Sequence, residues 1–396
     1  MMKLAILTCG TLPIPAVQGG AIENFIDYYL DYNDRNKLHD ITVYSPWVPE
    51  ITSHPALQSK VNHYHFIDVS SLKARIERRL RRLFHPNEYF NYFIEYYFEK
   101  VYTDIKKNNY DYIIIENSPG LAYKLSKRGH KNLVLHMNND LLNSDTPHHE
   151  FIYNSFVKIM TVSNYIKKRV DTIQPNNNIQ VLNNGIDLQN FSRKDNPSVT
   201  RESMGFSKDD FVIVYSGRIN DEKGVSELID AMLLLKSHSN LKLMIIGGTF
   251  FGNAGNENDF VRSLKEKAEA IKDKIVFTGF IPYEKVPDYL QLADIAALPS
   301  IWNDPFPTTE LEAQAMGLPI ITTVRGGIPE EVSEENAILL ETDEHIIDNM
   351  ASAIIDLYEH PEKRKKMAVV SLERAKLFSK EAFAEKFFAA LDELQH

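Results

Sequence analysis

The run Phe211-Val212-Ile213-Val214-Tyr215, continued by Ser216-Gly217-Arg218-Ile219-Asn220-Asp221-Glu222-Lys223-Gly224, decides the fold of this 396-residue chain. An unbroken apolar run of this length is typical of a parallel strand buried on both faces. The glycine-bounded polar turn that follows leads into a helical pattern from Val225. Similar runs cover residues 4–7, 41–44, 112–115, 133–135, 158–162 and 179–182 in the first half, and 243–246, 275–277, 295–298 and 320–322 in the second. Their alternation with helical patterns predicts doubly wound α/β domains.

A polar segment at Ser192–Asp210 interrupts the apolar pattern and predicts a linker. We therefore expect two Rossmann-like domains, over residues 1–195 and 205–375, facing a central cleft. Residues 376–396 are helical by composition, and we expect them to pack back on the N-terminal domain.

The composition is that of an ordinary globular protein, with 43% hydrophobic and 25% charged residues. A net charge of −10 argues against wholesale nucleic-acid binding. The single cysteine, Cys9, forbids an internal disulfide and fits a reducing compartment. No apolar run approaches the ~18 residues that would span a bilayer, and the N-terminal apolar segment is too short for a signal peptide. We expect a cytoplasmic protein.

Two motifs carry features of anion binding. Gly19 and Gly20 precede a helical pattern, where backbone N–H groups and the helix dipole attract an anion. They do not form the GxGxxG dinucleotide fingerprint, and a mere tight turn is the alternative. Arg218 and Lys223 flank the turn after residues 211–217, and a planar fork of donors with a mobile cation suits a diphosphate. The alternative is a solvated charged turn.

The densest signal is the proline-rich segment Pro299–Ala313. It leads into a helix expected to begin near Thr308, which places Asp304 and Thr309 at its N-terminus and Glu312 one turn inside it. Carboxylates so placed commonly bind sugar and ribose hydroxyls. In the alternative reading, the threonines cap the helix and the acids complement its dipole.

Taken together and in order, these segments resemble the GT-B retaining glycosyltransferases of family 4, also called glycosyl transferases group 1. The residues that carry the resemblance extend over nearly the whole chain: Gly19-Gly20 with Glu23, Asn184–Asp187 with Phe191, Gly217-Arg218, Lys223-Gly224, Phe277–Phe280, Ala293-Asp294 and Pro299–Ala313. The resemblance implies a GT-B fold and a nucleotide-sugar donor.

It also implies roles for individual residues. Arg218 and Lys223 would hold the donor diphosphate, with Gly217 beside them and Gly19 and Gly20 reaching it from the first domain. The base and ribose would lie against the remaining donor residues, Phe280, Ile281 and Glu312. His136 matches the family's histidine that contacts the transferred sugar, although a lone histidine at a strand end is more often structural.

This chain departs from the family pattern at three places. The first of two glutamates spaced eight residues apart is Asp304, and the usual glycine is Pro307, for which the hydroxyls of Thr308 and Thr309 could compensate. A glycine-x-glycine pattern has become Gly247-Gly248-Thr249, with a polar insertion through Asn258.

The expected mechanism needs no metal. The sequence holds no Asp-x-Asp triplet, so Arg218, Lys223 and helix N-termini would neutralise the leaving group. No carboxylate is evidently placed as a covalent nucleophile. The resemblance implies retention of configuration by same-face attack, with the departing phosphate helping to remove the acceptor proton.

A basic stretch, Lys73–Arg82, indicates the acceptor. Arg75, Arg78, Arg79 and Arg82 accompany a helical stripe of Leu72, Ile76, Leu80 and Leu83, and aromatics follow from Tyr89. Such a helix can lie on an anionic membrane that holds a lipid-linked acceptor. In the alternative, the stripe packs on its own domain and the aromatics are core.

We thus expect a hexosyltransferase of cell-surface polysaccharide biosynthesis, acting on a glycan or lipid-linked acceptor and peripheral at the inner face of the plasma membrane. We expect a UDP-sugar as donor because UDP is common in the family, and no residue of the sequence excludes GDP. A phosphorylase or epimerase is a second enzymatic reading. A degenerate relative that binds nucleotide or glycan in an assembly or coat role is the non-enzymatic one.

Overall fold

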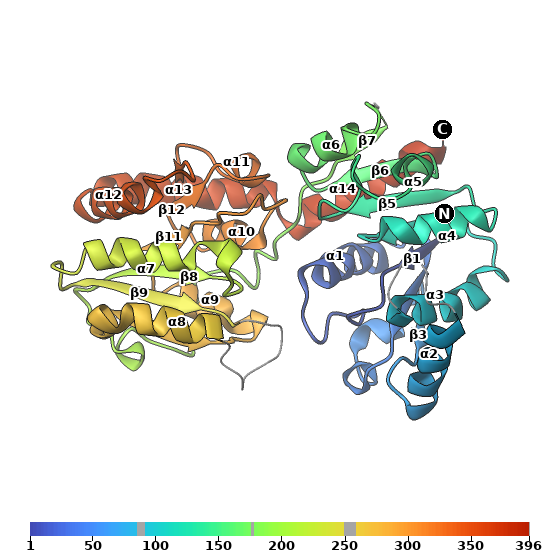
Figure 1. Cartoon of the computed structure of the whole chain (residues 1–396), viewed down its shortest axis with the longest axis horizontal. Helices are drawn as coiled ribbons and strands as arrows, with labels where there is room; N and C mark the ends of the chain where they lie inside the picture. Colours follow the sequence, from blue (N-terminus) through green and yellow to red (C-terminus); the bar gives the residue numbers. More distant parts are fainter. Residues whose placement is uncertain (85–91, 176–177, 249–258, 396) are drawn as a thin grey trace. The chain divides into compact units, whose positions relative to one another are not determined.

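The computed structural model describes residues 1–84, 92–175, 178–248 and 259–395. The chain divides into an N-terminal unit, Met1–Asn183 with Glu381–His396, and a C-terminal unit, Asn184–Lys380. Figure 1 shows each unit as a sheet lined by helices.

The N-terminal unit is built on a seven-stranded sheet in the order β3-β2-β1-β4-β5-β6-β7, and its paired neighbours all run parallel. The interior strand β1 is buried on both faces, which is what its apolar run predicts. The strands are β1 (Lys3–Leu7), β2 (Asp40–Pro46), β3 (Asn62–Ile67), β4 (Tyr112–Glu116), β5 (Leu133–Met137), β6 (Phe156–Thr161) and β7 (Ile179–Val181). The helices are α1 (Ala21–Asn36), α2 (Leu72–Phe84), α3 (Tyr92–Ile105), α4 (Pro119–Lys127), α5 (His149–Tyr153), α6 (Asn164–Asp171) and α14 (Lys380–Asp392).

The C-terminal unit repeats the scheme with six parallel strands in the order β10-β9-β8-β11-β12-β13. The strands are β8 (Phe211–Ser216), β9 (Leu241–Ile246), β10 (Ile275–Gly279), β11 (Ile295–Leu298), β12 (Ile320–Thr323) and β13 (Ala337–Leu340). The helices are α7 (Val225–Leu234), α8 (Asp259–Lys267), α9 (Val286–Leu290), α10 (Thr308–Ala315), α11 (Ile328–Glu331), α12 (Ile346–Glu359) and α13 (Pro361–Leu377). Two parallel-sheet Rossmann-like units confirm the predicted fold class.

The segment expected to be the linker is instead docked on the C-terminal unit. Arg193 Nε donates to the carbonyl oxygen of Met316 at 3.3 Å, and Lys194 forms an ion pair with Asp288 at 2.7 Å. The ring of Phe191 lies 5.2 Å from that of another residue in this unit, Tyr283. The boundary therefore falls at Asn184 rather than near residue 195, because side chains after it pack against α9 and α10.

The two chain segments near the unit boundaries are bonded to each other. The N–H of Ile186 donates to the carbonyl oxygen of Phe378 at 2.7 Å, and the N–H of Lys380 donates to that of Ile186 at 2.9 Å. Beyond this bridge the chain enters α14, whose phenylalanines join the core of the N-terminal unit. Phe387 stacks on Tyr29 at 4.0 Å between ring centroids.

Candidate active site

Three loops of the C-terminal unit are packed backbone against backbone where neighbouring strands end. They follow β8, β11 and β12, which are adjacent in the sheet. A Cβ added at Gly224 (φ 69°) would lie 1.9 Å from the carbonyl oxygen of Pro299, and one at Gly326 (φ 58°) would lie 2.1 Å from that of Asp304. Only glycine permits both the close approach and the positive φ. The loops are therefore held in one mutual arrangement.

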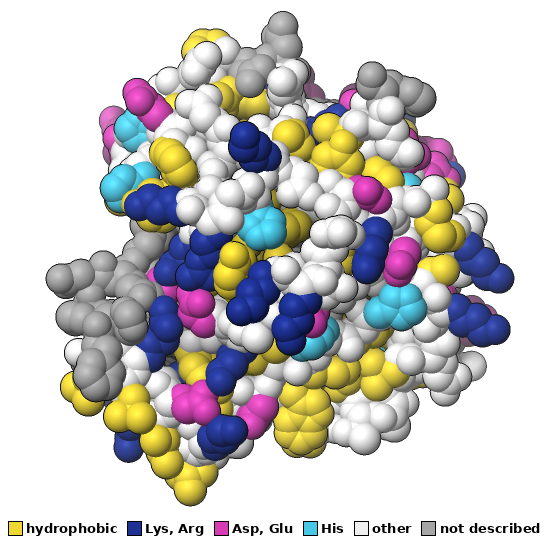
Figure 2. All heavy atoms as spheres, turned by 90° about the vertical axis from the view of Figure 1, so that its right-hand side faces the viewer, with side chains coloured by type: hydrophobic (Ala, Val, Ile, Leu, Met, Phe, Trp, Pro, Cys, Tyr) yellow, Lys and Arg dark blue, Asp and Glu magenta, His cyan; other side chains and the backbone are white. Residues whose placement is uncertain are grey.

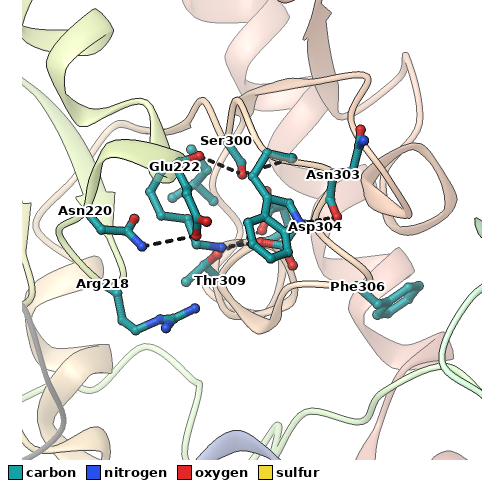
Figure 3. Close-up of polar contacts among 12 residues, drawn as sticks. Arg218, Asn220, Glu222, Ser300, Asn303, Asp304, Phe306 and Thr309 are labelled. Carbon is teal, nitrogen blue, oxygen red and sulfur yellow. Dashed lines mark hydrogen bonds and ion pairs between the residues drawn. The ribbon is translucent and has the colours of Figure 1, made fainter. Parts of the chain in front are cut away.

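This packing brings Lys223 to Asp304. The N–H groups of Ile301 and Trp302 donate to the carbonyl oxygen of Glu222 at 3.0 and 3.1 Å, which joins the turn carrying Lys223 to the loop after β11. The ammonium of Lys223 forms an ion pair with the carboxylate of Asp304, which is labelled in Figure 3. The two side chains retain only 20% and 12% of their exposure. Lys223, which we expected to bind the donor phosphate, is thus paired with a carboxylate of the protein itself.

Arg218 supplies an exposed cation beside this pair. Its backbone is fixed, because the hydroxyl of Tyr215 donates to its carbonyl oxygen at 2.7 Å. Within the described ranges, its guanidinium makes no hydrogen bond or ion pair, and Figure 3 shows it outside the dashed contacts. Because the guanidinium of Arg218 is unpaired, it is available to bind an anionic ligand beside the Lys223–Asp304 pair.

Glycine also shapes the end of β8. Gly217 has a φ of 144°, and a Cβ placed there would lie 3.6 Å from Cγ2 of Thr309. A Cβ at Gly247 would lie 1.8 Å from the carbonyl oxygen of Gly217, so the loops after β8 and β9 also touch through backbone. The start of α10 thereby lies beside the end of β8.

The N-terminus of α10 faces these loops without a side-chain cap. Pro307 occupies the N-cap position, so the reading in which Thr308 and Thr309 cap the helix was wrong. The hydroxyl of Thr309 instead donates to the carboxylate of Glu310 at 2.8 Å. The first N–H groups of a helix have no acceptor within it, and they attract negative charge.

Three buried carboxyl groups lie behind this N-terminus. Burial raises the pKa of Glu312 to about 8, against a hydrogen bond from Thr308. Burial also raises the pKa of Glu310 to about 7, with the charge of Asp304 adding to the effect. Both carboxyl oxygens of Glu331 are buried without a hydrogen-bond partner in the described structure, and burial raises its pKa well above the usual range. Sequence reasoning proposed only Glu312 among these three residues.

The residues expected near the base lie at the end of β10. Phe280 keeps 39% of its surface exposed and Ile281 is half-buried. A Cβ at Gly248 would lie 3.6 Å from that of Phe280, so the two backbones approach closely. The inserted residues 249–258 lie outside the described residues. An exposed aromatic ring at a strand end can stack on a planar base.

In the N-terminal unit, the predicted glycine pair begins α1. Gly19 and Gly20 have φ values of 76° and 107°. The carboxylate of Glu23 turns back over Gly20, whose added Cβ would lie 2.1 Å from Oε2. Burial raises the pKa of Glu23 to about 7. An internal acid therefore occupies the helix end where an external anion was expected.

His136 lies inside the N-terminal unit rather than at a free edge. The strand β5 continues to Met137, so His136 is within it and shares a face with Val134. The side chain is fully buried, with Nδ1 2.9 Å from Oε2 of Glu116. Its ring lies 6.0 and 5.9 Å from those of two α14 residues, Phe383 and Phe387. α14 covers that face of β5, while Nε2 of His136 is buried without a hydrogen-bond partner in the described structure, so the contact to a sugar stays a prediction.

Asn138 is the residue that sequence reasoning missed. It directly follows β5, and its N–H donates to the side chain of Asn117 at 3.0 Å. Its amide nitrogen and oxygen are both buried, and neither has a hydrogen-bond partner in the described structure. Buried amides are nearly always bonded, which makes Asn138 a candidate contact for a polar ligand. The signal was its position at the carboxyl edge, which the expected end of β5 at Leu135 obscured.

The basic stretch forms α2. Arg75 and Arg79 are exposed and Arg78 is half-buried, while the side chain of Arg82 lies outside the described residues. The following aromatics fall partly outside as well, and those described from Tyr96 to Phe98 are buried.

Two kinds of feature are absent from the described residues. No group of three or more His, Cys, Asp or Glu in them could hold a metal ion. Each helix within the described ranges is too short or too polar to span a bilayer.

Comparison with known proteins adds a family domain. Residues 198–370 match the model of the family described as glycosyl transferases group 1. "Putative glycosyltransferase YtcC" of Bacillus subtilis (strain 168) is 29% identical over 92% of this chain and 86% of its own length. "Spore coat protein SA" of the same organism is 26% identical over 94% of each chain.

A solved structure repeats the architecture. Anabaena Alr3699/HepE, crystallised in complex with UDP and glucose, matches with a TM-score of 0.73 and 20% identity over 99% of both chains. The likeness extends over both units and identifies the fold as GT-B. Residues 198–370 therefore match a group 1 glycosyl transferase domain, the relatives named glycosyltransferases support a transferase, and the fold is that of GT-B glycosyltransferases.

Proposed function

We propose that this enzyme transfers a hexose from a nucleoside diphosphate sugar, preferably a UDP-sugar, to a glycan or lipid-linked acceptor in cell-surface polysaccharide biosynthesis. The observation that carries the proposal is the cluster at the ends of β8 and β11, where Lys223 and Arg218 lie beside the open N-terminus of α10. The Anabaena relative in fold binds UDP, which supports the choice of donor. The cytoplasm, at the inner face of the plasma membrane, is the proposed location.

The diphosphate would take the place of Asp304 on Lys223. In the ligand-free arrangement, the carboxylate of Asp304 neutralises the ammonium and keeps it in position. A bound diphosphate carries more charge than one carboxylate and also engages Arg218. Asp304, released from the pair, can accept a hydrogen bond from a sugar hydroxyl. The ribose hydroxyls would bind Glu312, which as a protonated acid can donate as well as accept.

The chemical step proposed here needs no metal and retains configuration. The bond between the anomeric carbon and the phosphate oxygen breaks, and the acceptor oxygen forms a new bond on the same face. The acceptor proton goes to the departing phosphate oxygen. Lys223, Arg218 and the N-terminus of α10 stabilise the negative charge that grows on the diphosphate, and preorganised donors of this kind often supply most of an enzyme's rate enhancement.

Release of nucleoside diphosphate tests this proposal. Purified full-length protein is supplied with UDP- and GDP-hexoses in the presence of a chelator, and release of UDP or GDP is followed with and without glycan acceptors. We expect Lys223→Ala to lower kcat by about 100-fold to 1,000-fold, as when a preorganised oxyanion donor is removed. Lys272→Ala is the matched control, because Lys272 is an exposed lysine paired with Glu269. Activity that strictly requires magnesium would refute the metal-independent step.

One alternative has a specific observation in its favour. The Lys223–Asp304 pair already satisfies the cation that a donor would need, and one relative is named as a spore coat protein. A protein that binds nucleotide or glycan without transfer would fit both facts. Tight binding of UDP by calorimetry, with no release from any donor and acceptor tested, would favour this alternative.

A further inference from the structure

Helix α2 presents its apolar residues to solvent instead of to the core. Leu72, Ile76, Leu80 and Leu83 keep 73%, 49%, 50% and 73% of their surface exposed. At about 100° per residue they lie within about 80° of the helix circumference. They therefore form one continuous outward stripe, which we call the α2 stripe.

The opposite face of α2 is tied to the N-terminal unit by polar contacts. Ala74 is buried there. Glu77 pairs with Lys100 of α3 at 2.6 Å, and Arg81 lies 3.7 Å from Glu99 of the same helix. The helix is thus fixed with its charged contacts inward. The reading in which the stripe packs on its own domain does not describe these residues.

Basic side chains border the α2 stripe. Arg75 and Arg79 follow one edge and Lys73 follows the other, and all three are exposed. Neither Arg75 nor Arg79 forms an ion pair with a residue in the described ranges. Figure 2 shows a face of the N-terminal unit where Lys and Arg side chains gather, with apolar side chains beside them. α2 itself lies at the lower right in Figure 1.

We infer that the α2 stripe docks on an anionic lipid bilayer, lying in the plane of the interface. Helices with a leucine-rich face and basic flanks bind this way, since the apolar side chains enter the acyl boundary while cations meet lipid phosphates. The chain as a whole carries a net charge of −10, so a local cationic border is required for attraction to such a surface. A second copy of the chain is disfavoured as occupant, because the two basic borders would repel each other.

The inference deepens the proposed function, since it places the transferase where a lipid-linked acceptor would lie. Its test needs neither donor nor acceptor. Full-length protein is co-sedimented with vesicles of phosphatidylcholine alone and with an equimolar mixture of phosphatidylcholine and phosphatidylglycerol. We expect binding to the mixed vesicles at low salt, weaker binding at high salt, and little binding to the neutral vesicles.

Two double variants separate the apolar and the electrostatic contributions. Leu72→Ser with Leu83→Ser is expected to lower the partition coefficient about tenfold by removing buried methylene groups. Arg75→Glu with Arg79→Glu is expected to lower it at least about tenfold by charge reversal. The controls are Val369→Ser with Leu377→Ser and Lys272→Glu with Lys376→Glu, which change residues that are also exposed, elsewhere on the chain. Circular dichroism melts check that every variant folds.

Three results would overturn the inference: no vesicle binding, equal binding to neutral and anionic vesicles, or a dimer by sedimentation velocity that dissociates when the α2 stripe is changed. Donor turnover measured without vesicles is independent of all three. Membrane binding with no turnover would leave the inference intact and count against the proposed function. Turnover with no membrane binding would support the proposed transfer reaction and overturn the inference.

Discussion

The two units share a parallel sheet lined by helices, yet they treat their motif residues differently. In the C-terminal unit, the expected donor residues lie on loops after β8 and β11, and the fold brings Lys223 and Asp304 into contact. In the N-terminal unit, His136 is sealed within β5, and Glu23 fills the helix end prepared by Gly19 and Gly20. The loop motif of the C-terminal unit leaves Arg218 exposed beside the Lys223–Asp304 pair, whereas the N-terminal motif residues are covered by α14 or by an internal acid.

The largest expected effect tests the backbone contacts of the C-terminal loops. Gly224→Ala would place a Cβ 1.9 Å from the carbonyl oxygen of Pro299 at a φ of 69°. We expect the free energy of unfolding of this unit to fall by about 4 kcal/mol, from strain and overpacking together. Urea denaturation followed by fluorescence measures it.

Gly205→Ala is the matched control, because Gly205 also has a positive φ (79°) but nothing lies within 4 Å of its added Cβ. It should cost only about 1–2 kcal/mol, the left-handed strain alone. Equal losses in both variants would mean that the loop contact is unimportant.

The next effect tests whether His136 is structural. His136→Ala removes the partner of Glu116, which is itself fully buried, and leaves a cavity against Phe383 and Phe387. We expect a loss of about 3 kcal/mol in unfolding free energy, from the cavity and from the buried hydrogen-bonding group left without its partner. The KM for donor at a temperature where the variant is folded should change little. A large rise in KM with full stability would place His136 on the sugar after all.

Most of the fold could be predicted from sequence because central strands of parallel sheets are continuous apolar runs. The two strands that escaped prediction, β3 and β13, are the edge strands of one side of each sheet. β3 carries Asn62, His63 and His65 among its six residues, and β13 has only four. Edge strands face solvent on one side, so their apolar signal is weak.

The candidate site was predictable to the extent that its residues follow strands. Lys223 and Asp304 could be named from spacing, but their ion pair depends on the packing of Gly224 and Gly326 against distant backbone. The burial of His136 could not be foreseen, because it is produced by α14, more than two hundred residues later in the chain. The exposure of the α2 stripe likewise depends on contacts with α3.

Titration provides an effect that can be measured in the C-terminal unit by itself. Burial raises the pKa of Glu312 to about 8 and that of Glu310 to about 7 in the folded unit. In the unfolded chain both carboxyl groups have the ordinary pKa near 4.5, so above this pH the folded unit keeps protons that the unfolded chain has released. This contribution to stability is complete below pH 4.5 and is lost as pH rises to about 8. Each group adds a slope of up to about 1.4 kcal/mol per pH unit within that window.

The sequence has two tryptophans, Trp47 in the N-terminal unit and Trp302 in the C-terminal unit. Replacing Trp47 by phenylalanine therefore leaves a fluorescence signal from the C-terminal unit alone. In that background, Glu312→Gln should flatten the fall in stability between pH 5 and pH 8, and Glu362→Gln, at an exposed position, should not. An unchanged slope in Glu312→Gln would show that Glu312 is ionised in the folded protein.

The smallest expected effect returns to the N-terminal unit and asks what Asn138 does. Its amide is buried without a hydrogen-bond partner in the described structure, so Asn138→Ala removes an uncompensated polar group and should leave unfolding free energy unchanged or slightly higher. If a sugar hydroxyl completes the amide's hydrogen bonds, the same variant should raise KM several-fold, the loss of one hydrogen bond of about 1 kcal/mol. Asn183→Ala is the contrasting control, because that amide already donates to the carbonyl oxygen of Val162 at 2.9 Å and should lose stability without a change in KM. An unchanged KM in Asn138→Ala would leave the N-terminal unit without an identified sugar contact at the end of β5. Every candidate donor contact would then belong to the C-terminal unit.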